Sequence, residues 1–151
     1  MTFVADGMLG NAAKWLRLAG YDALYFNTRR KSELVRIARR DGRILLTRDR
    51  KLFEENEGIA VFIESEGTSR QLREIKNKLL LEINPMMFFT RCSLCNSPLE
   101  RKEKYDITAL VPEYVYANRD KFSQCPECRR VYWDGDHCKA IRDALNELGE
   151  G

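Results

Sequence analysis

Short runs of apolar residues alternate with amphipathic segments along the first 85 residues of the chain. The apolar runs predict buried strands at residues 2–5, 23–26, 43–47 and 59–63. Between them, apolar residues recur at intervals of three and four, which is the spacing of one face of a helix; Leu9, Ala12, Ala13 and Leu16 are an example. This alternation of strand and helix predicts an α/β fold with a parallel sheet and helices on both faces.

The ends of the predicted helices carry their own signals. Ser32 and Ser69 are placed to accept hydrogen bonds from the first turns of two helices, and Gly42 and Pro85 are predicted to end those helices. Helices are therefore predicted over residues 8–19, 33–41, 50–56 and 70–84.

A second part of the chain follows residue 85 and has a different pattern. We expect an N-terminal domain of residues 1–85 and a C-terminal part of residues 86–151. The pattern between residues 103 and 124 is ambiguous, with a strand as one interpretation of Glu113–Ala117. The spacing of apolar residues predicts a final helix over residues 137–148.

The composition supports a folded protein and excludes several other classes. Apolar residues make up 44% of the 151 positions, which is enough for a core, so extended disorder is not expected. No apolar run approaches the roughly 20 residues of a membrane span, and no secretory signal precedes the first strand, so we expect a cytoplasmic protein without a membrane partner. His137 is the only histidine, which excludes a Ser-His-Asp triad and an HExxH metal pair.

All five cysteines follow residue 91, and four of them form two Cys-x-x-Cys pairs: Cys92 with Cys95, and Cys125 with Cys128. In a cytoplasmic chain this pattern indicates a structural zinc site rather than disulfides. Each turn presents two thiolates to one ion, and two such turns complete a tetrahedral shell of four sulfurs, as in a zinc ribbon. The alternative is a redox-active pair, but no thioredoxin-like pattern surrounds either one.

Basic residues are concentrated between residues 29 and 51, where ten Lys and Arg accompany only three Asp and Glu. The run indicates a surface that attracts a polyanion such as RNA, and an ordinary solvated helix face is the alternative. Arg48 directly precedes an acidic candidate and is the strongest candidate for a phosphate contact. The candidate nucleic-acid contacts are Lys14, Arg17, Arg29, Arg30, Lys31, Arg36, Arg40, Arg48 and Arg50, with Arg39 beside them.

Three acidic residues are predicted to meet at one edge of the sheet. Asp6 ends the first strand, Asp49 follows the third, and Glu33 lies in the first turn of the helix after the second. Ligands of parallel sheets bind at the carboxyl ends of the strands, and carboxylates gathered there suit Mg²⁺ or Mn²⁺, which can activate water against a phosphodiester. Taken singly, each acid has an ordinary alternative as a helix cap or a strand end. Asp22 precedes the second strand, so we expect it at the opposite edge.

Three ordered segments stand out in the first half of the chain: Phe3-Val-Ala-Asp6-Gly-Met-Leu-Gly, Trp15-Leu-Arg-Leu-Ala-Gly-Tyr-Asp22 and Arg43-Ile-Leu-Leu-Thr-Arg-Asp49-Arg. A fourth, Val131-Tyr-Trp-Asp-Gly-Asp-His137, follows the second cysteine pair. Together they resemble the Mut7-C family, in which a PIN-like nuclease domain is often followed by a zinc ribbon. The resemblance covers nearly the whole chain and implies a PIN-like fold with metal-dependent RNase activity.

The resemblance also implies roles for individual residues. Asp6 and Asp49 match acidic positions of the family, and Glu33 matches the acidic position of its second helix. Asp22 matches a family residue as well, whereas the fourth acid that is common in PIN nucleases has no clear match. The implied partner is RNA, with tRNA or rRNA precursors as candidates.

Two functions of different classes remain open on the sequence. The first is a metal-dependent endoribonuclease that cuts RNA with Asp6, Glu33 and Asp49. The second is an RNA- or ribosome-binding maturation factor whose PIN-like site is weak or inactive. A toxin-like PIN nuclease is a further alternative, and the oligomeric state is left open.

Overall fold

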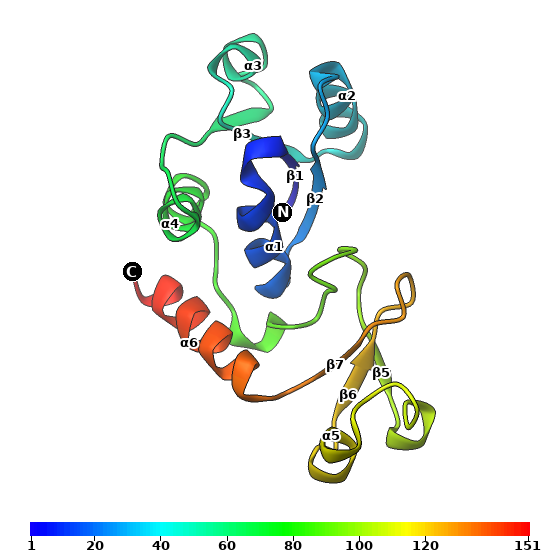
Figure 1. Cartoon of the computed structure of the whole chain (residues 1–151). Coiled ribbons are helices and arrows are strands. Elements are labelled where there is room, and N and C mark those ends of the chain that lie inside the picture. Colours follow the sequence, from blue (N-terminus) through cyan, green and yellow to red (C-terminus); the bar gives the residue numbers. More distant parts are fainter.

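In the computed structural model, which describes residues 1–151, the first four strands form one parallel sheet (Figure 1). They are β1 (Thr2–Asp6), β2 (Asp22–Phe26), β3 (Ile44–Thr47) and β4 (Ala60–Phe62). Their order across the sheet is β2-β1-β3-β4, and every pairing is parallel. The predicted α/β class is confirmed, and each strand end lies within one residue of its predicted position.

Helices cover both faces of the sheet, as predicted. They are η1 (Gly7–Leu9), α1 (Gly10–Leu18), α2 (Lys31–Asp41), α3 (Arg50–Glu55) and α4 (Thr68–Leu79). Successive residues of a strand point to opposite faces. Phe3 and Ala5 of β1 therefore pack on the side of α1 and α4. Val4 packs on the other side, against Leu34 of α2 and Leu52 of α3.

Two predicted helix starts and one predicted helix end are wrong. Helix α2 begins at Lys31 and α4 at Thr68, so Ser32 and Ser69 lie inside the first turns and cap neither helix. Helix α4 ends at Leu79, because Leu80 adopts a left-handed conformation with φ of 53° and its N–H closes the last turn on Lys76. The expected stop, Pro85, instead begins the short 3₁₀ turn η2 (Pro85–Met87).

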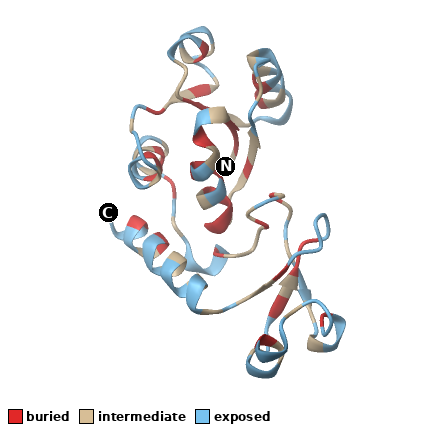
Figure 2. Cartoon of the chain, viewed as in Figure 1, coloured by how far each residue is buried: buried red, intermediate tan, exposed pale blue.

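The cysteine-containing part forms a separate small sheet. Its strands β5 (Glu100–Lys102), β6 (Phe122–Gln124) and β7 (Val131–Trp133) are antiparallel and lie in that order. A core of four buried residues supports it: Ile107, Val115, Phe122 and Val131. Figure 2 shows this small buried group apart from the larger one around the parallel sheet. We call residues 91–135 the ribbon.

The strand considered for Glu113–Ala117 is wrong, because the segment forms helix α5 (Glu113–Asn118). The N–H groups of Val115 and Tyr116 both donate to the carbonyl oxygen of Pro112, which closes the first turn. Proline directly before a helix and an acidic residue in the first turn both favour a helix start. The turn η3 (Lys104–Asp106) lies between β5 and α5.

The last helix, α6 (Asp136–Glu150), leaves the ribbon and packs against the N-terminal part (Figure 1). Leu148 belongs to the same core cluster as Phe3, and Leu145 packs with Leu18 and Ala19 of the α1 end. Burying one such leucine contributes about 1.5–3 kcal/mol. The sequence division at residue 85 groups α6 with the ribbon, whereas its buried side chains complete the core of the first 85 residues.

The first cysteine loop of the ribbon is hydrogen-bonded to the amino edge of the parallel sheet. Asn96 of that loop accepts from the N–H of Ala23 at 2.9 Å and donates to Asp22 at 2.7 Å. Asp22 also accepts two hydrogen bonds from the guanidinium of Arg43, at 2.7 and 3.2 Å. Asp22 therefore lies at the edge predicted for it, where it joins the sheet to the ribbon.

We predict that Asp22→Asn lowers stability rather than altering the chemistry of the site. Burial raises the pKa of the Asp22 carboxyl, but the hydrogen bonds from Arg43 and Asn96 outweigh it and hold that pKa below its usual value. The stabilisation is therefore present above about pH 4 and is lost as the pH falls. Losing charged hydrogen bonds of this kind costs about 1–3 kcal/mol, measured by denaturant unfolding at pH 7.

The matched control is Asp120→Asn, because the Asp120 side chain is 94% exposed and contacts only a surface lysine. We expect it to change the unfolding free energy by less than about 1 kcal/mol. Equal effects of the two substitutions would contradict a structural role for Asp22.

Candidate active site and metal centre

Asp6 is the only acidic residue of the chain that is buried. It ends β1 at the carboxyl edge of the sheet, and its side chain is 4% exposed. A buried carboxylate needs hydrogen bonds and a counter-charge to offset the loss of hydration. Asp6 accepts from the N–H of Gly7 at 2.7 Å and from the hydroxyl of Thr47 at 2.8 Å, and it forms an ion pair with the ammonium of Lys31.

Thr47 connects the two predicted aspartates. It ends β3 and is fully buried; its hydroxyl donates to Asp6 and accepts from the N–H of Asp49 at 2.9 Å. Asp49 in turn accepts from the N–H of Leu52 at 3.1 Å, so it caps helix α3. Sequence reasoning missed Thr47. The signal that could have found it is a hydroxyl residue that ends an apolar strand two positions before an acid.

Glu33 follows β2 and forms no ligand cluster with the two aspartates. It occupies the first turn of α2, its side chain is 48% exposed, and it lies 3.8 Å from the guanidinium of Arg30. The only group of three or more Asp, Glu, His and Cys side chains close enough to share an ion is formed by cysteines. Asp6, Glu33 and Asp49 therefore form no ligand cluster.

Lys31 occupies the position beside Asp6 where a metal ion would neutralise the carboxylate. Its side chain is 36% exposed, so the ammonium can leave for solvent without disturbing the core. A cavity of about 460 Å³ adjoins this edge and is lined by Gly7, Asn11, Tyr25 and Gln71 among others. None of the three acids lines this cavity, and Asp6 can take a metal ion in place of the ammonium only if Lys31 moves away.

The basic candidates differ in their exposure and in the partners that they already contact. Arg48 donates to the carbonyl oxygens of Ile63 and Glu64 at 3.3 and 3.0 Å, so it supports the segment after β4. Arg40 forms two hydrogen bonds with Asp41, and Arg50 lies 4.4 Å from the ring centre of Phe62. The exposed candidates are Lys14, Arg29, Arg30, Arg36, Arg39, Arg40 and Arg50.

The prediction that Arg17 contacts RNA is wrong, because Arg17 is only 9% exposed to solvent. Its guanidinium donates to the carbonyl oxygen of Ala23 at 2.7 Å and to those of Ser93 and Leu94 at 3.0 and 3.1 Å. Arg17 therefore connects α1 and β2 to the first cysteine loop. Its place on the inner side of a helix explains why charge alone misassigned it.

The two Cys-x-x-Cys turns have the same backbone geometry. The residue after each pair, Asn96 or Arg129, is left-handed with φ of 68° and donates its N–H to the carbonyl of the first cysteine at 2.9 Å. The N–H of the first cysteine of each pair donates to the carbonyl oxygen of the residue five positions later. The distance is 2.9 Å from Cys92 to Ser97 and 3.0 Å from Cys125 to Arg130. Each turn therefore presents its two sulfurs on one side of a compact loop.

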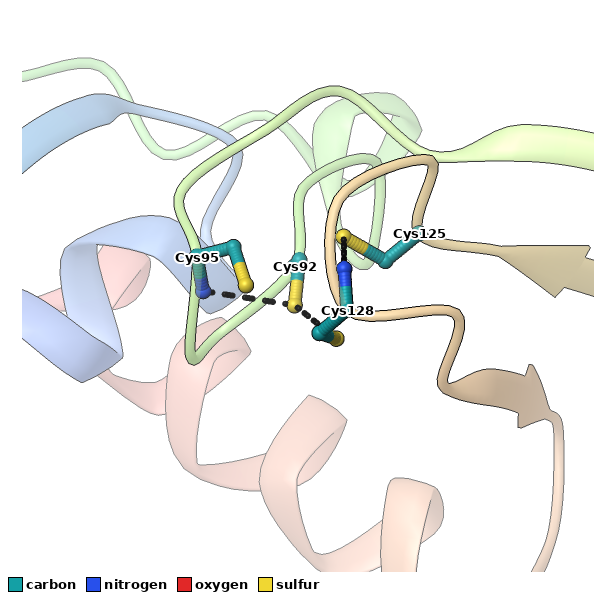
Figure 3. Close-up of side chains that lie close together, drawn as sticks. All are labelled: Cys92, Cys95, Cys125 and Cys128. Carbon is teal, nitrogen blue, oxygen red and sulfur yellow. Dashed lines mark hydrogen bonds between the residues drawn. The ribbon is translucent and has the colours of Figure 1, made fainter.

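The four sulfurs face one another across the two loops (Figure 3) and lie within 4.8 Å of each other. The sulfurs of Cys92 and Cys128 are 3.9 Å apart, close to the edge of about 3.8 Å in a tetrahedron with Zn–S bonds of 2.3 Å. Burial raises the pKa of Cys92, but hydrogen bonds from the Tyr132 hydroxyl, at 3.1 Å, and from loop N–H groups bring it to about 7. The donor set and its spacing fit a structural zinc ion.

Comparison with protein families matches residues 1–145 to the Mut7-C RNAse domain. The chain belongs to the Mut7-C RNAse domain family. The Mut7-C match spans both the parallel sheet and the ribbon, and it indicates a nuclease function. No curated protein and no solved structure matches the chain. None of its helices is long and apolar enough to cross a membrane.

We predict about one zinc ion per chain, and we expect Cys125→Ser to remove it and to unfold the ribbon. Because Arg17 and Asp22 are bonded to the first cysteine loop, the parallel sheet should also lose stability. Elemental analysis and thermal unfolding measure the two effects.

The control for this prediction is Cys138→Ser, which lies outside the cluster and should keep the zinc. A zinc content far below one per chain in the native protein would contradict the assignment. Zinc loss without any change in the unfolding of the Mut7-C sheet would contradict the coupling.

Proposed function

We propose that the chain is a divalent-metal-dependent ribonuclease that cleaves RNA internally at the carboxyl edge of the parallel sheet. One observation carries the proposal: the only buried acid of the chain, Asp6, lies at this edge with a displaceable ammonium as its counter-charge. Family membership supports the nuclease class, and the edge is where parallel sheets bind ligands. The zinc of the ribbon has a structural role in this proposal.

In the proposed mechanism Asp6 and Asp49 would hold Mg²⁺ or Mn²⁺ once Lys31 has moved away from Asp6. The ion, once bound, supplies an activated water and offsets the charge that develops on the scissile phosphate. The Thr47 hydroxyl orients the Asp6 carboxylate and accepts from the backbone N–H of Asp49, and departure of Lys31 would free a position on the Asp6 oxygen that the ammonium contacts. Glu33 orients the attacking water or an outer ligand, and its half-exposed side chain is free to turn towards the edge.

The proposed partner is RNA in the cytoplasm, where four reduced cysteines can hold zinc. The exposed arginines of α2 and of the segment before it supply sequence-independent contacts to the phosphate backbone. Precursors of tRNA or rRNA are the candidate substrates.

A second candidate function is binding of RNA without cleavage, as in a maturation factor. It is favoured by one observation: the three acids do not form a ligand cluster, and both oxygens of Asp6 already accept hydrogen bonds. The cleavage experiment below separates this function from the first.

We predict that Asp6→Asn and Asp49→Asn each abolish cleavage of a labelled structured RNA in Mn²⁺ or Mg²⁺. Each change keeps the shape of the side chain and removes a ligand charge, and the loss of several kcal/mol of transition-state stabilisation lowers the rate by more than about 100-fold. RNA binding should persist, because the basic surface is unchanged. Mn²⁺ affinity, measured by calorimetry, should fall in the same variants.

Asp41→Asn is the control, since Asp41 ends α2 in contact with Arg40 and lies away from Asp6. Undiminished cleavage by the Asp6 variant, or by the native protein after metal removal with EDTA, would contradict the mechanism. Absence of cleavage by the native protein in every metal would favour the binding function.

We also predict that Arg36→Glu weakens binding to RNAs of different sequence to a similar degree. Arg36 is exposed and has no carboxylate within 4.0 Å, so a phosphate contact would not compete with an ion pair. The slope of log affinity against log salt concentration should decrease in magnitude by about 1, the value expected for the loss of one phosphate contact. Lys139→Glu on α6 makes the same change of charge on an exposed residue, and it should leave the slope unchanged. Equal effects would indicate that only net charge matters.

A further inference from the structure

The ribbon contains a cavity of about 410 Å³ that the proposed nuclease site does not use. It lies between α5, the end of β7 and the start of α6, on a different part of the molecule from Asp6. Its size is in the range of sites that bind small organic groups.

Two aromatic side chains line this cavity, Tyr114 and Trp133. Tyr114 is 71% exposed, because the next residue of α5, Val115, takes the inward position in the ribbon core. Trp133 ends β7 and packs partly against the same core, which fixes its ring. Exposed aromatic rings beside a cavity are the usual platform for stacking an unpaired base.

The polar groups of the cavity suit the rest of a nucleotide. Arg119 follows α5, and no carboxylate lies within 4.0 Å of its guanidinium, so its charge is available to a phosphate. Asn118 uses its amide N–H to donate to the carbonyl of Tyr114 at 2.7 Å, which leaves its amide oxygen as an acceptor. Asp136, at the start of α6, supplies a second acceptor for the amino groups of a base.

We propose that this cavity binds one unpaired nucleotide of the RNA substrate. The base stacks on Tyr114 and Trp133, Arg119 contacts a phosphate, and Asn118 and Asp136 accept from the edge of the base. A base inside a duplex cannot enter, because its faces and its pairing edge are occupied. The inference rests on the proposed function in that its ligand is the nuclease's RNA, and it specifies a substrate with a single-stranded segment near the cleaved one.

The test uses the whole chain carrying Trp15→Phe, which leaves Trp133 as its only tryptophan. Fluorescence is recorded while an oligocytidylate of about 12 nucleotides, whose bases carry an amino group, is added without Mg²⁺ or Mn²⁺, and a gel verifies that the probe stays intact. We expect the emission of Trp133 to be quenched on binding, because the base stacks on its ring. A blunt RNA duplex of equal length should quench it far less.

Substitutions then locate the binding. Tyr114→Ala and Arg119→Gln should each weaken oligocytidylate binding by about tenfold, the usual effect of removing one stacking or phosphate contact. Tyr105→Ala is the matched control, because Tyr105 is 76% exposed in the same ribbon but does not line the cavity. Zinc content and thermal unfolding verify that each variant is folded.

Three results would overturn the inference: unchanged emission of Trp133 with bound RNA, equal binding of duplex and single strand, or equal effects of Tyr114→Ala and Tyr105→Ala. Cleavage is assayed separately with Mn²⁺, so the two proposals fail independently. Quenching without cleavage would overturn the nuclease mechanism and support the cavity. Cleavage without quenching would support the nuclease mechanism and overturn the proposal for the cavity.

Discussion

Strand β1 is paired on both edges and covered on both faces, and the buried Asp6 and the junction with the ribbon lie at its two ends. Phe3, Val4 and Ala5 have no exposure to solvent. A strand buried in this way can place polar chemistry only where it begins and where it stops. Its carboxyl end supplies Asp6. At its amino end Asp22 begins β2 and accepts from Asn96 of the ribbon, and Arg43, just before β3, holds Asp22 in place.

The two ends neutralise their acids in different ways. Asp22 has a guanidinium and an amide as fixed partners, and such a planar pair is strong and well oriented. Asp6 instead has a lysine on a long, partly exposed stem, so its counter-charge can be exchanged for another cation. The partners of Asp22 join the sheet to the ribbon, whereas the partner of Asp6 is carried on a partly exposed side chain.

The hydrophobic core of the ribbon is too small to stabilise it without further support. Four buried residues are few for an independent unit, and structures of this size usually depend on a metal or on a larger neighbour. Arg17 and Asn96 join the first loop of the ribbon to the sheet, and the four cysteines gather their sulfurs in one place, where a zinc ion would add further support. Helix α6 then returns from the ribbon to the large core, so the chain crosses between the two parts twice.

The sequence by itself determined the α/β class, the four strands, the grouping of four cysteines and the edge at which Asp6 and Asp49 lie. These follow from local periodicity, from the spacing of the cysteine pairs and from the polarity of parallel strands. The sequence did not determine which charged side chains are buried and which partners they contact. Arg17 and Lys31 both count as cations in the sequence, yet one is buried against backbone carbonyls and the other pairs with Asp6. The roles of Thr47, of helix α5 and of α6 were likewise decided by tertiary packing, because which side of an element faces a partner depends on neighbours that are distant in the chain.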